Sequence, residues 1–303
     1  MEHLLVSIFA PIMEMIAPII PGEYFPYFFT MEMFQRSLIA SILVTITAGL
    51  IGSFLLLRNL ALIGDGLAHV SFGGIAIAIA LGSTAPLWYG LFFSVISSII
   101  IYELQSREIL SGDASIAIFL TGMLGLGLVV LRIWGGGITT DIEGYMFGSL
   151  LLVDNSSLNL IILIFLVTLI SILVLYRGLL AISLDPISAE VQGLPVRKMG
   201  LWFSILTALV VVSMVKITGT LLATALLVTP AATAQQVSRS FKTSLIWTQI
   251  FGLIMLFLGL YFSAENGTGS GSMIALVSVI VFGLVTISAQ IYKNYFQNSK
   301  SLE

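Results

Sequence analysis

Nine long apolar runs, separated by short polar connections, dominate the pattern of hydrophobic and polar positions along the chain. The runs cover residues 35–57, 61–81, 87–105, 114–133, 157–176, 199–216, 219–238, 244–263 and 273–292. Each is close to the roughly twenty residues that a helix needs to cross a bilayer of about 30 Å. The alternation typical of barrel strands is not seen, which leaves helices as the spanning structure. The pattern therefore predicts an all-α bundle of about nine transmembrane segments.

Composition supports a membrane location for most of the chain. Hydrophobic residues make up 58% of the sequence and charged residues 9%, and the mean hydropathy is +1.10. A soluble domain carries about a quarter charged residues, so we expect an integral, multi-pass protein of the cell membrane. The absence of Cys excludes disulfides, thiolate metal sites and cysteine nucleophiles. The net charge of −3 gives no sign of a nucleic-acid partner.

The basic residues are distributed unevenly over the connections. If nine spans alternate in direction, Arg36, Arg132 and Lys216 fall on one side. The other side receives Arg58, Arg107, Arg177, Arg197, Lys198, Arg239, Lys242, Lys293 and Lys300. The positive-inside rule then places the N-terminus outside and the C-terminus in the cytoplasm. We expect an extracytoplasmic or interfacial segment over 1–33 with a short helix at 3–17, a transmembrane domain over 34–293, and a cytoplasmic tail over 294–303.

One stretch places metal-binding side chains at membrane depth. Asp65 and His69 lie four residues apart in the run 61–81, so they share one helix face with Cβ atoms about 5–6 Å apart. A carboxylate in mid-membrane costs on the order of 2.5–3.5 kcal/mol, so it is kept where it faces a partner or a wet cavity. The pair is therefore a candidate cation site. The alternatives are that Asp65 pairs with Arg58, two turns back, and that His69 is a core imidazole bonded to a neighbouring helix.

Further polar candidates lie in the run 219–238 and in an outer loop. Pro230 predicts a kinked spanning helix over 219–238, in which Thr224 and Thr229 either line a polar path or bond their own backbone. Asp141 and Glu143 follow three glycines on the outer side. Acidic residues there either draw cations toward the membrane or belong to a simple solvated loop.

The connection 177–198 carries the signals of a short helix outside the membrane. Asp185 is a good N-cap, Pro186 suits the first helical position and Gly193 suits the position after the helix end. The predicted helix consists of Pro186, Ile187, Ser188, Ala189, Glu190, Val191 and Gln192. A structured turn and a helix that docks a partner are both consistent with this pattern.

Several motifs, in their order and spacing, resemble the membrane permease of zinc/manganese ABC importers over roughly residues 33–292. They are Phe34-Gln-Arg-Ser-Leu, Leu57-Arg-Asn-Leu-Ala-Leu-Ile-Gly-Asp-Gly-Leu-Ala-His, Tyr145-Met-Phe-Gly-Ser, Leu184-Asp-Pro, Gly193-Leu-Pro-Val-Arg and Thr229-Pro-Ala-Ala-Thr-Ala. The resemblance implies two partners, an extracytoplasmic metal-binding protein and a separate cytoplasmic ATPase subunit. It also implies that Asp65 and His69 line the metal passage and that 185–193 is the coupling helix that seats in a groove of the ATPase.

Two departures from the family pattern stand out. Gly73 occupies a position where the family often has Pro, so the helix after His69 is expected to bend differently. The first thirty or so residues have no counterpart in the usual short N-terminus.

The chain carries no motif of an enzyme. It lacks the Gly-Lys-Ser/Thr ending of a nucleotide-binding loop, so ATP hydrolysis belongs to the partner subunit. The resemblance implies a homodimer, which would offer two Asp and two His to transported Zn²⁺, Mn²⁺ or Fe²⁺, and the count of four ligands slightly favours zinc. No cofactor is expected on this subunit. The alternatives are a permease for iron chelates or cobalamin and an ion-coupled secondary transporter, which would work without an ATPase.

Overall fold

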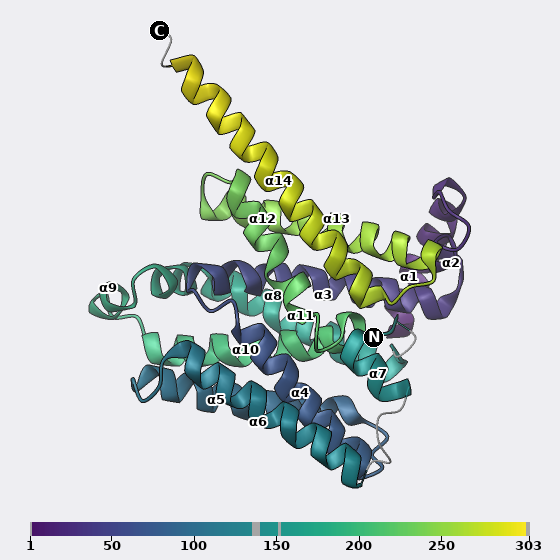
Figure 1. The fold of residues 1–303 in the computed structure, drawn as a ribbon, viewed down its shortest axis with the longest axis horizontal. Coiled ribbons are helices and arrows are strands. Elements are labelled where there is room, and N and C mark those ends of the chain that lie inside the picture. The colour runs from purple at the N-terminus through teal and green to yellow at the C-terminus, as the bar shows by residue number, and fades with distance from the viewer. Residues whose placement is uncertain (1, 135–139, 151–152, 301–303) are drawn as a thin grey trace.

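The computed structural model describes residues 2–134, 140–150 and 153–300, and these residues form helices without strands (Figure 1). Eight helices of the described part are long and apolar enough to cross a membrane. They are α3 (Glu32–Leu57), α4 (Ile63–Ala80), α5 (Pro86–Ser106), α6 (Gly112–Ile133), α8 (Asn155–Leu184), α10 (Val196–Thr218), α13 (Phe241–Asn266) and α14 (Ser270–Lys300). The predicted polytopic helical bundle is confirmed. Helix α14 continues through residues 294–300, which the sequence assigns to a tail.

The run 219–238 is not the single kinked helix that the sequence predicts. It contains two short helices, α11 (Ala223–Leu227) and α12 (Thr229–Val237). Gly219 ends α10 with φ of +78°, and Pro230 in the first turn of α12 has no N–H to continue the ladder of α11. The chain therefore crosses this part of the bundle as an interrupted segment.

The interrupted segment still returns the chain to the opposite end of the bundle. Phe241, the first residue of α13, packs its ring 4.9 Å from that of Phe54, in the last turn of α3. Helix α9 (Pro186–Val191) lies at this same end, here called the α9 end, and α2 (Tyr27–Thr30) lies at the other, the α2 end (Figure 1). In the described part of the chain, eight long helices and the interrupted segment account for the nine predicted runs. The side that faces the cytoplasm stays a prediction.

The most buried spans are α3, α4 and α10, with 78% of the apolar window of each inside the structure. Helix α14 is the least buried, at 17%. Small residues bring the central helices close, because a Cβ added at Gly52 of α3 would lie 1.8 Å from the carbonyl oxygen of Leu227 in α11. The candidate site therefore belongs to the packed centre of the bundle.

The N-terminal segment is fastened to the last helical pair. It contains α1 (Glu2–Ile16), as the sequence predicts, a 3₁₀ turn (Ala17–Ile19) and α2. The carboxylate of Glu265 accepts hydrogen bonds from the backbone N–H groups of Glu23, Tyr24 and Phe25 at 3.1, 3.0 and 2.9 Å. The Phe25 ring also packs edge-on against Tyr261. One carboxylate at the end of α13 thus clamps the chain just before α2.

Candidate functional site

Helix α4 presents Asp65 and His69 on consecutive turns at the centre of the bundle. His69 is 6% exposed and Asp65 is partly buried. Glycines allow α4 to approach its neighbours closely, because a Cβ at Gly64 would meet Leu227 of α11 and one at Gly73 would meet the carbonyl oxygen of Met123 in α6. The backbone of α4 that carries the two polar side chains is therefore packed closely between α11 and α6.

Asp65 is not neutralised by Arg58, which was the structural alternative for this carboxylate. The Arg58 guanidinium lies over the ring of Phe203, 5.1 Å from the ring centroid. The ion pairs given for the described residues join Arg107 and Arg197 to Glu103, and Lys216 to Asp154. The Asp65 carboxylate has none of these cations as its partner.

The imidazole of His69 has a free coordinating atom. Its Nδ1 is buried and has no hydrogen-bond partner among the described residues. An unpaired polar atom in the interior is costly, so this geometry does not match a bonded core imidazole. The pair therefore offers an oxygen and a nitrogen ligand one helical turn apart.

A cavity of about 380 Å³ opens beside Asp65, and both candidate threonines line it. Its walls come from α4, the interrupted segment and α14. The lining residues are Ala61, Leu62, Asp65, Leu221, Leu222, Thr224, Ala225, Val228, Thr229, Ala275 and Val279. Thr233, one turn beyond Thr229, bonds its own backbone at 2.7 Å and takes no part. Thr224 and Thr229 thus lie on the side of the interrupted segment that faces this cavity.

The described part of one chain has no group of three or more His, Asp or Glu side chains able to hold a metal ion. Asp65, Thr224 and Thr229 line one cavity and present oxygen atoms to it, whereas His69, one helical turn from Asp65, is not among the residues that line this cavity.

Of the two acidic outer residues, only Glu143 has a described side chain. Glu143 is exposed on α7 (Thr140–Phe147), and the side chain of Asp141 lies outside the described residues. Glu143 does not line the cavity beside Asp65.

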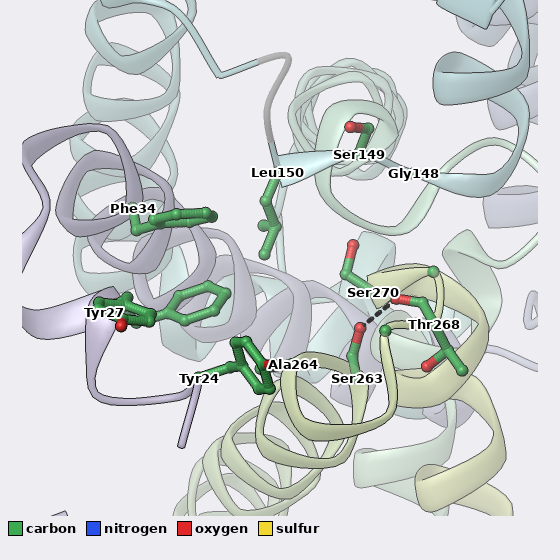
Figure 2. Close-up of a pocket in the computed structure, with 13 residues that line it drawn as sticks. Tyr24, Tyr27, Phe34, Gly148, Ser149, Leu150, Ser263, Ala264, Thr268 and Ser270 are labelled. Carbon is green, nitrogen blue, oxygen red and sulfur yellow. Dashed lines mark hydrogen bonds between the residues drawn. The ribbon is translucent and has the colours of Figure 1, made fainter. Parts of the chain in front are cut away.

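A different pocket of about 380 Å³ lies at the α2 end (Figure 2). The rings of Tyr24, Tyr27 and Phe34 and the side chain of Leu150 lie on one side of it, opposite the turn where Ser263 donates to the carbonyl of Thr268 at 2.6 Å. Among the described residues that line this pocket there is no His, Asp or Glu. Sequence reasoning missed it because its walls come from segments far apart in the chain.

Helix α9 forms where the sequence predicts it and has the predicted caps. Asp185 accepts hydrogen bonds from the backbone N–H groups of Ile187 and Ser188 at 3.0 and 3.1 Å, and from the Ser188 hydroxyl. Hydrogen bonding from Ser188 and Ile187 holds the pKa of Asp185 below its ordinary value. Gly193 closes the helix with φ of +83°. The helix is a well-defined element and not a loose turn.

The outer face of α9 is apolar although it lies beyond the spans. Ile187 is 76% exposed and Val191 is 85% exposed, whereas Ala189 is buried against the bundle. The following helix is tied down at its start, because Arg197 pairs with Glu103 of α5 at 2.7 Å. Helix α9 is thus connected to the bundle through α8 before it and through α10, which is tied to α5, after it.

Comparisons with known proteins agree on one family. The model of the ABC 3 transport family matches residues 30–289. The manganese transport system membrane protein MntC of Listeria innocua is 30% identical over 84% of this chain and 90% of its own length. The manganese import system permease protein ScaB of Streptococcus gordonii is 31% identical over 82% and 88%. The structure of PsaBC from Streptococcus pneumoniae in complex with Fab superposes with a TM-score of 0.73 at 29% identity, covering 84% of this chain and 90% of that one.

Proposed function

The chain belongs to the ABC 3 transport family, and we propose that it is the membrane permease of an ATP-driven importer that carries manganese past Asp65 and His69. The observation that carries the proposed path is the buried Nδ1 of His69, which has no hydrogen-bond partner among the described residues, one turn from a carboxylate that forms no ion pair with a described Arg or Lys. A passing divalent cation supplies the missing positive charge at Asp65 and occupies the free nitrogen of His69.

The interrupted segment completes the path in this proposal. Thr224 and Thr229 line the same cavity as Asp65 and offer oxygen atoms to an ion that has lost part of its water. Irregular backbone at membrane depth is tolerated where it borders a cavity, which is the position of the break between α11 and α12. A second copy of the chain would bring a second Asp65 and His69, so a homodimer would double the ligand set.

We propose manganese and not zinc as the transported ion, because the relatives are named for manganese transport. The sequence alone leans slightly to zinc from a count of four N and O ligands. MntC and ScaB are both named for manganese, and carboxylate, hydroxyl and water oxygens suit this ion. Iron remains the third ion to test.

The family also indicates two kinds of partner, an ATPase subunit and a substrate-binding protein. We assign the ATPase contact to α9, because its exposed Ile187 and Val191 form a small apolar knob next to the basic Arg197 and Lys198. Closure of the ATPase would displace α9 and, through α10, the packed centre where α4 lies. Alternating access would follow from this rigid linkage, with hydrolysis on the partner.

The test is uptake into vesicles that contain the permease and its cognate ATPase. Wild type, Asp65→Asn and His69→Ala are compared for manganese, zinc and iron, with Asp113→Asn as a control, because Asp113 is an exposed acid on α6. We expect ATP-dependent manganese uptake to fall at least about tenfold in both site variants and to persist in the control. Uptake near the wild-type rate in either site variant, with ATPase binding intact, would disprove the proposed path.

A further inference from the structure

A larger cavity lies at the α9 end of the bundle, apart from the candidate metal path. It has a volume of about 720 Å³ and is enclosed by the end of α12, the start of α13 and the C-terminal half of α14. Figure 1 shows α12 and the C-terminal half of α14 extending toward the same end of the molecule as α9. By the positive-inside prediction this is the level of the inner headgroups.

The cavity carries positive charge. Arg239 and Lys293 line it, and none of the described residues of its wall is an Asp or a Glu. Within the described part of the chain, the side chains of Arg239 and Lys293 form no hydrogen bond or ion pair. Arg197 and Lys216, by contrast, both have carboxylate partners. Amide and hydroxyl groups, including those of Gln236 and Ser288, supply further hydrogen-bonding atoms beside the two cations.

The rest of the wall is apolar and includes an aromatic pair. The ring of Trp247 stacks on that of Phe251, with centroids 5.5 Å apart, and Leu284 and Val285 face them from α14. Tryptophan favours the boundary between headgroups and acyl chains. The cavity therefore joins a cationic mouth to an apolar wall that lies along two spans.

We propose that this cavity binds an anionic phospholipid, with the headgroup phosphate between Arg239 and Lys293 and an acyl chain along Trp247 and Phe251. Charge complementarity selects this occupant, because a basic pocket between spans at the inner leaflet attracts acidic headgroups. Helix α12 connects the lipid site to the metal path, since it begins at Thr229 and ends at Val237, which line the two cavities. The binding claim itself does not depend on what the protein transports.

The test measures quenching of Trp247 by brominated phosphatidylglycerol and by brominated phosphatidylcholine, in full-length protein whose other tryptophans are replaced by Phe. We expect phosphatidylglycerol to quench at the lower mole fraction. The variant Arg239→Gln/Lys293→Gln should weaken this preference by about fivefold for each charge removed. The control Lys198→Gln/Lys242→Gln removes two exposed basic charges that do not line the cavity and should keep the preference.

A second variant tests whether a weaker lipid preference comes from lost charge or from misfolding. Arg239→Lys/Lys293→Arg retains both charges and should behave as wild type, which would separate lost charge from lost structure. Equal quenching by the two lipids in the wild type would overturn the proposal. The proposal would also be overturned if free glycerol phosphate, at the same concentration as the lipid, displaced brominated phosphatidylglycerol from the cavity. If Arg239→Gln/Lys293→Gln lost ATPase binding or self-association while its quenching by both lipids stayed unchanged, the cavity would be a protein interface and the lipid proposal would be wrong.

Discussion

Arg58 lies over the face of the Phe203 ring, with its guanidinium carbon 5.1 Å from the ring centroid, although the sequence places it within reach of Asp65. The arginine is thus held by an aromatic ring of α10, and its contact links the end of α3 to α10. Asp65 is left to face the cavity.

This geometry separates the two residues experimentally. We expect Arg58→Gln to lower thermal stability by about 0.5–2 kcal/mol through loss of the cation–π contact, while retaining most manganese uptake per folded molecule. Asp65→Asn should instead lose most manganese uptake while keeping the thermal stability of the wild type. The measurement is uptake normalised to folded protein, together with thermal unfolding in detergent. If Arg58→Gln abolished uptake without loss of stability, Arg58 would act on the metal path.

Gly52 is predicted to position the interrupted segment. A Cβ at this position would lie 1.8 Å from the carbonyl oxygen of Leu227, which is backbone and cannot rotate away. Gly52→Ala should therefore destabilise the protein by about 1–3 kcal/mol and displace α11 from the cavity. Gly122→Ala is the matched control, because a Cβ at Gly122 of α6 has no atom within 4 Å. Equal thermal unfolding of the two variants would contradict the close contact between α3 and α11.

Asp185 is predicted to hold α9 in shape for the ATPase. Asp185→Ala removes the acceptor for two backbone N–H groups and should weaken ATPase binding about fivefold, whereas Glu190→Ala on the same exposed helix removes no cap. Pull-down of the ATPase at graded concentrations measures the difference. Unaltered binding by Asp185→Ala would show that the cap does not matter for docking.

The same cap gives a pH prediction. The Ser188 hydrogen bonds lower the pKa of folded Asp185 from its ordinary value of 3.8. A carboxyl whose folded-state pKa is lowered contributes fully above its ordinary pKa and loses its contribution as pH falls through the folded value. ATPase binding should therefore show no inflection from Asp185 between about pH 5 and 8. An inflection in that range that disappears in Asp185→Ala would contradict the assignment.

Glu265 is predicted to fasten the N-terminal segment. Without its carboxylate the backbone N–H groups of residues 23–25 lose their acceptor, so the chain around Tyr24 and Tyr27 opens more often. Chymotrypsin should then cut Glu265→Ala severalfold faster near these tyrosines than wild type. Glu14→Ala, on the exposed face of α1, serves as control. Identical cleavage rates in the two variants would argue against the clamp.

The sequence by itself determined the features that depend on neighbouring residues. Eight apolar runs became long helices because twenty or so consecutive apolar residues can satisfy their backbone in lipid only in this way. Helix α9 begins after Asp185 and ends before Gly193 because caps act on the nearest backbone groups. The spacing of Asp65 and His69 likewise placed them on one face of α4. The family followed from motifs that can be read along the chain.

Only the tertiary structure decided which of these elements meet. It placed Arg58 on Phe203, left Nδ1 of His69 unpaired, and brought Thr224 and Thr229 to the cavity of Asp65. It also joined Glu265 to residues 23–25, more than two hundred positions away in the chain. These contacts depend on the packing of whole helices against one another, and the local pattern of apolar and polar residues carries no signal for them.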